Sequence, residues 1–298
     1  MSGMTNRGSR SIACYALLLW ALAMPACAGE QRVTLGSVAA VAWTPGEAAS
    51  LALPLVVFSH GSHGCATQSR FLMRAIADAG YIVVAPNHRD ATCDETGAPR
   101  PGASAEAPIA RPELWSPETY RGRADDIRKA IDALRQDPAW TRRIDWRHLA
   151  LAGHSLGGYT VLGLAGAWPA WRLAGVSAVL ALSPYTRPFL LHRTLPDLNA
   201  PVMYQGGTRD IGLTPVVAQS GGAYALSPPP KYFVEFTDAG HLAWTDRSDE
   251  ARAGIVAYAV AFLDRHVKGA PAAPVLTEVS ADVARLLYDL GDGSPGNF

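Results

Sequence analysis

The chain has 298 residues, of which 49% are hydrophobic and 17% are charged. Its 26 basic and 26 acidic residues are mixed along the sequence, which argues against a protein that binds nucleic acid through a basic face. No run of 20 apolar residues is present, so we expect no stable insertion into a membrane. The hydrophobic content is too high for a disordered chain, and the length suits one large domain or two small ones.

Residues 1–28 have the order of features typical of a secretory signal peptide. Two arginines precede an apolar run over residues 12–24, and an A-x-A cleavage site ends at Ala28. The apolar run is too short to span a bilayer. We therefore expect export to the periplasm or the medium, with cleavage near Ala28. The alternative is a lipoprotein signal in which Cys27 carries the lipid, although the residues before Cys27 fit that pattern poorly.

From residue 29 to about residue 270, strand-like and helix-like segments alternate, which predicts one layered α/β catalytic domain. Residues 271–298 are expected to form a linker and a C-terminal tail. Residues 33–43 predict one or two strands broken at Gly36, and apolar or β-branched runs predict further strands at residues 55–58, 81–85, 148–152, 176–182, 201–205 and 231–236. Helices are predicted at residues 71–79, 117–134, 156–167 and 248–267, with a final short helix over residues 279–290.

The motif Gly153-His154-Ser155-Leu156-Gly157 lies between a predicted strand and a predicted helix. A serine on such a sharp turn has its hydroxyl lifted above the sheet, and small residues on both sides tolerate the strained backbone. The motif letters alone are a weak signal, but the strand before them and the helix after them favour a nucleophile. We therefore predict Ser155 as the nucleophile, in preference to a simple surface turn.

A serine hydroxyl needs a base, and the base needs a carboxylate to orient it. His241 follows the last predicted strand, where a loop can return over the carboxyl edge of the sheet, whereas His154 is expected to be directed elsewhere by its backbone. Asp210 follows the strand at residues 201–205 and is preferred to Asp238. The chain order of nucleophile, acid and base is the one expected for an α/β-hydrolase.

The oxyanion that develops during acyl transfer requires preorganised donors. We predict that the backbone N–H groups of Ser62 and Leu156 supply them, because Ser62 lies in a loop of small residues after a strand and Leu156 follows the nucleophile. His60 and His63 in the same loop are an alternative metal site, but no acidic or cysteine partner with metal spacing accompanies them. We therefore expect these histidines to shape the loop, and we expect no metal.

Removal of the signal would leave two cysteines, Cys65 and Cys93. Both follow strands expected to end at the same edge of the sheet, and an exported protein favours oxidation. We predict a disulfide between them.

These segments together resemble the platelet-activating-factor acetylhydrolase and dienelactone-hydrolase-like branch of the α/β-hydrolases. The resemblance rests on residues 58–61, 79–85, 87–90, 153–158 and 239–241 and extends over about residues 50–265. It implies a mainly parallel eight-stranded sheet with helices on both faces, no cofactor, and ester hydrolysis through an acyl-enzyme. The chain departs from dienelactone hydrolases proper, which have cysteine where this chain has Ser155. It departs from secreted polyester hydrolases by having no cysteine beyond Cys93.

Three functions follow as hypotheses. The first is an exported serine esterase acting on a small-molecule carboxylic ester, with Trp115 of the proline-rich loop 91–116 and Tyr185 lining the substrate pocket. The second is an acyltransferase that uses the same triad, since the choice between water and another acceptor depends on water exclusion. The third is a catalytically silent binding domain on a hydrolase scaffold. Nothing in the sequence points to a particular oligomeric state.

Overall fold

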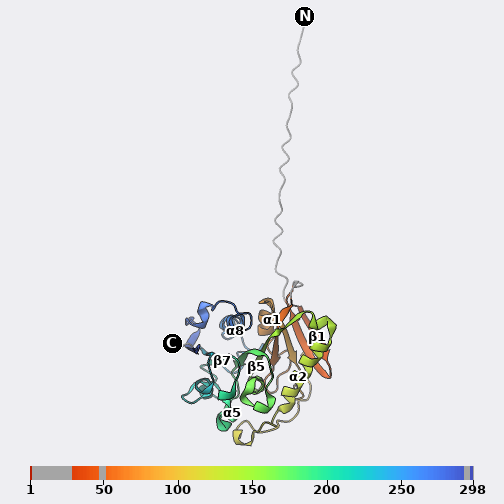
Figure 1. Cartoon of the computed structure of the whole chain (residues 1–298). Coiled ribbons are helices and arrows are strands. Elements are labelled where there is room, and N and C mark those ends of the chain that lie inside the picture. Colours follow the sequence, from red (N-terminus) through yellow and green to blue (C-terminus); the bar gives the residue numbers. More distant parts are fainter. Residues whose placement is uncertain (2–28, 47–51, 292–295, 298) are drawn as a thin grey trace.

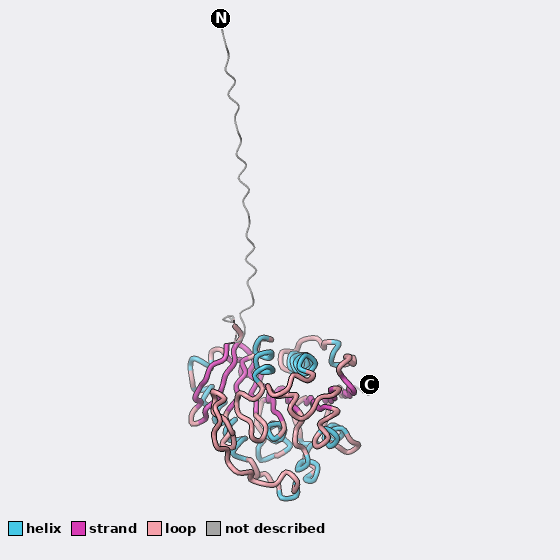
Figure 2. Tube along the Cα trace, turned by 180° about the vertical axis from the view of Figure 1, so that it is seen from behind, coloured by secondary structure: helices cyan, strands magenta, loops and turns pink. Residues whose placement is uncertain are grey.

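The computed structural model describes residues 1, 29–46, 52–291 and 296–297. Apart from Met1, the predicted signal peptide lies outside the described residues. Within the described residues, a ten-stranded sheet forms the centre of the molecule, and helices cover both of its faces (Figures 1 and 2).

The strands follow the spatial order β1-β2-β4-β3-β5-β6-β7-β8-β9-β10. Neighbouring strands from β4 to β8 are parallel, whereas the pairs at both ends of the sheet are antiparallel. Their bounds are β1 Gly29–Leu35, β2 Val38–Thr44, β3 Leu53–Ser59, β4 Ile82–Pro86, β5 Ile144–His154, β6 Val176–Leu182, β7 Val202–Gly207, β8 Lys231–Phe236, β9 Val283–Asp289 and β10 Gly296–Asn297.

The helices connect these strands and vary in length. The α-helices are α1 Arg70–Asp78, α2 Arg121–Gln136, α3 Pro138–Thr141, α4 Leu156–Leu162, α5 Arg187–His192, α6 Thr214–Ala218, α7 Ala223–Leu226 and α8 Arg252–His266. A π-helix, η2, extends over Gly163–Ala167. Short 3-10 helices are η1 Pro112–Leu114, η3 Pro169–Trp171, η4 Leu195–Asp197 and η5 Pro274–Leu276.

The sheet separates two hydrophobic cores, because successive side chains of a strand point to opposite faces. In β3, Leu55 and Val57 pack into the core under α2 and α4, whereas Val56 and Phe58 pack into the core under α1 and α8. This explains why the central strands are continuously apolar in sequence: both of their faces are covered.

The two ends of the sheet differ from the sequence prediction. The sheet has ten strands and not eight, and the helix predicted over residues 279–290 is wrong, because Val283–Asp289 forms strand β9. β9 pairs antiparallel with β8, with Phe233 opposite Leu287, and so supplies hydrogen-bond partners to a strand that would otherwise be an edge. The C-terminal segment is therefore part of the sheet.

Helix α2 also begins later than predicted, at Arg121. The residue before it, Tyr120, has a left-handed backbone with φ of 61°, which interrupts the helix expected from residue 117. Residues 116–119 form a turn in which the Thr119 N–H donates to the carbonyl of Ser116.

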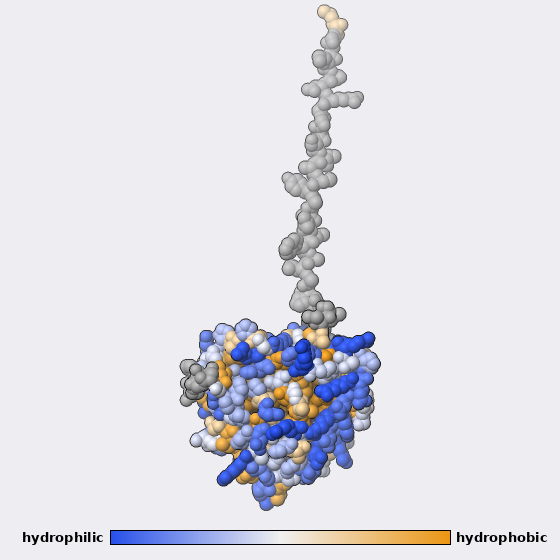
Figure 3. All heavy atoms as spheres, in the orientation of Figure 1, coloured by the Kyte–Doolittle hydropathy of each residue, from blue (hydrophilic) through white to orange (hydrophobic). Residues whose placement is uncertain are grey.

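Within the described residues, no helix is both long and apolar enough to cross a bilayer. Hydrophilic side chains cover much of the face in Figure 3, with hydrophobic side chains between them.

The predicted disulfide is confirmed: Cys65 and Cys93 are bonded, with their Cα atoms 5.5 Å apart. It ties the loop after β3 to the loop after β4. The side chain of Asn87 reinforces this connection, since its Oδ1 accepts from the Ala66 N–H at 2.7 Å and its Nδ2 donates to the carbonyl of Cys93 at 3.0 Å.

We predict that the double substitution Cys65→Ser and Cys93→Ser lowers the free energy of unfolding by about 3 kcal/mol. The cross-link joins residues separated by 28 positions, and its loss restores chain entropy to the unfolded state. Denaturant unfolding of oxidised wild type, reduced wild type and the variant would measure this. Equal stability of all three would contradict the prediction.

Candidate active site

Ser155 lies on a sharp turn between β5, which ends at His154, and α4, which begins at Leu156. Its backbone has φ of 56° and ψ of −115°, a strained conformation for a residue with a side chain. The flanking glycines make this turn sterically feasible. A Cβ on Gly157 would lie 1.9 Å from the carbonyl oxygen of Ser59, and one on Gly153 would lie 2.3 Å from that of Gly157.

The structure brings Ser155, His241 and Asp210 together at the carboxyl edge of the parallel strands. Oγ of Ser155 is 3.0 Å from Nε2 of His241, and Nδ1 of His241 is 3.4 Å from Oδ1 of Asp210. The His241 side chain is 36% exposed, whereas Asp210 is 4% exposed. An imidazole that carries its proton on Nδ1 toward the carboxylate leaves Nε2 free to accept the serine proton.

Ser183, directly after β6, is a functional candidate that the sequence did not reveal. Its Oγ is 2.8 Å from Nδ1 of His241 and donates to Oδ2 of Asp210, so it bridges base and acid. Thr214 donates to the same carboxylate oxygen at 3.2 Å. Burial alone would raise the pKa of Asp210, but the hydrogen bonds from His241 and Ser183 outweigh it and lower this pKa. The position of Ser183 directly after a parallel strand is the feature of the sequence that could have identified it.

A chain of hydrogen bonds joins the loop after β3 to the loop that carries His241. The Gly61 N–H donates to Oε1 of Gln68 at 3.0 Å, and Nε2 of Gln68 lies 3.1 Å from Nδ1 of His154. Nε2 of His154 then donates to the carbonyl of His241 at 2.9 Å. We expected the backbone to direct His154 away from the site, and this expectation is wrong. Its ring lies beside that of His241, with centroids 4.8 Å apart.

The two residues predicted to supply oxyanion donors both lie near the serine: Leu156 follows it in the chain, and Ser62 lines the same cavity. Leu156 is the first residue of α4, so its N–H has no acceptor within the helix. The Ser62 N–H has no hydrogen-bond acceptor among the described residues. A Cβ on the neighbouring Gly61 would lie 3.4 Å from Cβ of Ser155, which shows how closely this loop approaches the nucleophile position.

Two cavities meet at Ser155 and His241. One, of about 410 Å³, is mainly apolar and includes Trp115 and Tyr185, whose rings are 4.7 Å apart between centroids. Its other lining residues are Ile109, Leu156, Arg209, Asp210, Ile211, Gly212 and Leu213. The second, of about 350 Å³, is more polar and extends past Ser62 and Gln68 to the disulfide. The predicted pocket residues thus lie beside the predicted nucleophile.

The two histidines of the loop after β3 have different surroundings. Nδ1 of His60 donates to the carbonyl of Gly61 at 2.8 Å, and its Nε2 accepts from the His88 N–H at 3.1 Å. His63 is exposed, and its ring contacts Oγ of Ser62. The part of the chain that the structure describes has no cluster of three or more His, Cys, Asp or Glu side chains suited to a metal ion.

Comparison with protein families gives a match to platelet-activating factor acetylhydrolase, isoform II, over residues 29–115. The matched region contains β1 to β4, the loop with Ser62, and both cysteines of the disulfide. The chain has an α/β-hydrolase fold. The predicted resemblance to this family is confirmed over the matched residues, and it supports an enzyme that hydrolyses esters. Comparison with curated proteins gave no match.

We predict that the protein loses stability as the pH falls below about 6.5, because three buried histidines are neutral in the folded state. Burial, with the charge of Arg123 nearby, lowers the pKa of His60 and of His88 well below the usual range. Burial lowers the pKa of His154 to about 3. The unfolded chain therefore binds protons that the folded chain does not, and each histidine contributes up to about 2 kcal/mol of lost stability between pH 7 and pH 5.

Chemical unfolding at a series of pH values would test this prediction. His154→Gln should show a shallower decline than wild type, because it removes one of the groups that bind protons only in the unfolded chain. An identical slope in wild type and His154→Gln would contradict the assignment.

Proposed function

We propose that the protein is an exported serine hydrolase that cleaves carboxylic esters through an acyl-enzyme. The observation that carries the proposal is the 3.0 Å contact between Oγ of Ser155 and Nε2 of His241, on a strained turn at the mouth of two cavities. A serine held this way by a base that a buried carboxylate orients is the arrangement that activates a hydroxyl. The family match supports the ester as the bond that is cleaved.

In the proposed reaction, Ser155 attacks the ester carbonyl carbon while His241 accepts its proton. The N–H groups of Ser62 and Leu156 stabilise the tetrahedral oxyanion. Asp210 orients His241 and stabilises its protonated form. As the intermediate collapses, His241 gives the proton to the leaving alcohol. Water then attacks the acyl-enzyme with the same assistance and releases the acid.

The two cavities suit the two halves of an ester. The mainly apolar cavity has Trp115 and Tyr185 as buried aromatic walls. Hydrogen bonds fix both rings to the loop after β4: Nε1 of Trp115 donates to the carbonyl of Pro108, and the Tyr185 hydroxyl donates to that of Ile109. We assign this cavity to the apolar half of a small-molecule substrate and the more polar cavity to the other half.

Export is part of the proposal. The disulfide between Cys65 and Cys93 is compatible with an oxidising compartment outside the cytosol. The pattern of residues 1–28 also supports export, because it is typical of a secretory signal peptide.

We predict that the mature protein hydrolyses p-nitrophenyl esters from acetate to dodecanoate and that Ser155→Ala lowers kcat by at least about 10³-fold, because the nucleophile is lost. Steady-state rates along the series would measure both the loss and the acyl length that the cavity accepts. A matched control is Ser248→Ala, which replaces a serine in the loop before α8 that does not line either cavity. Equal rates in wild type and Ser155→Ala would refute the assignment of the nucleophile.

The same assay separates hydrolysis from transfer to another acceptor. Product analysis with and without an added alcohol would show a new ester if acyl transfer competes with hydrolysis. Free acid as the only product would support the hydrolase.

A further inference from the structure

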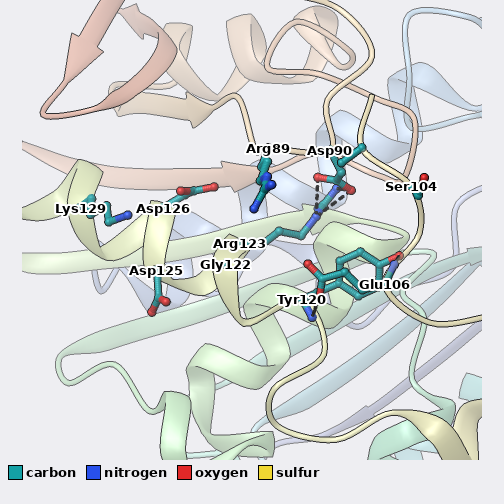
Figure 4. Close-up of a pocket in the computed structure, with 11 residues that line it drawn as sticks. Arg89, Asp90, Ser104, Glu106, Tyr120, Gly122, Arg123, Asp125, Asp126 and Lys129 are labelled. Carbon is teal, nitrogen blue, oxygen red and sulfur yellow. Dashed lines mark hydrogen bonds and ion pairs between the residues drawn. The ribbon is translucent and has the colours of Figure 1, made fainter. Parts of the chain in front are cut away.

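A buried arginine lies behind the loop that carries Ser62. Arg123, in the first turns of α2, is 2% exposed, so its charge requires compensation within the protein. Asp90 provides it, since Nη2 of Arg123 is 2.8 Å from Oδ2 of Asp90 and Nε is 3.1 Å from Oδ1 (Figure 4). Burial by itself would raise the pKa of Asp90, but the adjacent guanidinium outweighs burial and holds this pKa below its usual range.

The remaining donors of Arg123 are directed at the backbone of the loop. Nη1 donates to the carbonyl of His60 at 2.7 Å, and Nη2 lies 3.3 Å from the carbonyl of Gly61. The Gly61 carbonyl accepts two further hydrogen bonds, from Nδ1 of His60 at 2.8 Å and from the N–H of Gly64 at 3.1 Å. This single carbonyl is therefore held by three donors.

The direction of that carbonyl determines the direction of the next N–H. A trans peptide is planar, so the C=O of Gly61 and the N–H of Ser62 point in opposite directions. Arg123 lines neither of the two cavities at Ser155, so we infer that the carbonyl it holds points away from the site and that the Ser62 N–H points toward it. Preorganised donors stabilise a developing oxyanion because they need not reorient during the reaction.

We propose that Arg123, anchored by Asp90, is a positioning residue that aligns the Ser62 N–H for the oxyanion. This inference rests on the proposed function. Arg123 does not touch the substrate in this account, and it acts only through the Gly61–Ser62 peptide. A purely structural ion pair would affect stability alone, whereas a positioning role changes the rate of the chemical step in protein that remains folded.

The experiment compares ester hydrolysis by wild type, Arg123→Ala and Arg121→Ala. Arg121 is the matched control, because it lies on the same helix but is exposed, and its ion pair among the residues that the structure describes is with Glu118. We expect Arg123→Ala to lower kcat by about 10- to 100-fold, which is no more than the loss caused by removing an oxyanion donor itself. KM should change by less than about threefold. Arg121→Ala should match wild type.

The structure also allows chemical rescue. A cavity of about 460 Å³ reaches Arg123 and Asp90 from the solvent side, where Arg89, Glu106, Tyr120 and Lys129 also line it (Figure 4). Removal of the Arg123 side chain would extend this cavity to the vacated position. Free guanidinium ion at non-denaturing concentration should therefore restore kcat of Arg123→Ala, whereas sodium ion at the same ionic strength should not.

Asp90→Asn is the second variant, because it keeps the buried arginine and a neutral acceptor. It should lower kcat in the same direction but by less, again with little change in KM. Thermal unfolding of each variant establishes that it is folded at the assay temperature. Unchanged kcat in both folded variants, or a loss that appears only in KM, would overturn the proposal. A loss of kcat that guanidinium ion does not restore would also count against it. Absence of hydrolysis by wild type would instead refute the proposed function.

Discussion

The strained turn at Ser155 is the constraint on which the rest of the site depends. A positive φ at this residue is maintained because β5 is locked in the middle of the parallel sheet and α4 starts immediately after it. The turn also requires the backbone of Ser59 to pass directly over Gly157, a contact that no larger residue would permit. The end of β3 and the nucleophile turn are therefore fixed relative to one another by the backbone itself. The loop that follows Ser59 therefore also lies beside Ser155.

Side-chain hydrogen bonds then hold the loops on both sides of this turn in position. Gln68 and His154 connect the N–H of Gly61 to the carbonyl of His241, so the loop with the oxyanion donor and the loop with the base are held by one continuous chain of bonds. Because its pKa is depressed, His154 stays neutral and keeps one donor and one acceptor nitrogen, as this chain requires. On the opposite side of the His60–Gly61 peptide, Arg123 donates to the carbonyl of His60, and it also lies against the next carbonyl, that of Gly61. The proposed oxyanion site is thus supported from both sides.

Much of this architecture could be predicted from the sequence because it depends on local pattern. Continuous apolar runs identified the central strands, and the rule that parallel strands end at one edge led to Asp210 and His241, which the structure does bring beside Ser155. Strand β9 could not be predicted in this way, since its apolar residues fit helix and strand alike and only pairing with β8 decides between them. Ser183 and Arg123 were missed for a related reason. Their partners lie far away in sequence. Ser183 does follow a strand directly, but no local pattern shows which elements its hydrogen bonds, or those of Arg123, reach.

Activation of Ser155 by His241 can be tested by reaction of the folded, oxidised protein with a fluorophosphonate, followed by intact mass and peptide mapping. Such a reagent modifies a serine that an adjacent base has activated, and it requires no knowledge of the natural substrate. We expect a single adduct on Ser155 in the wild-type protein and no adduct on Ser155→Ala. Folded wild type that remains unmodified, or a variant that is labelled as fast as wild type, would contradict it.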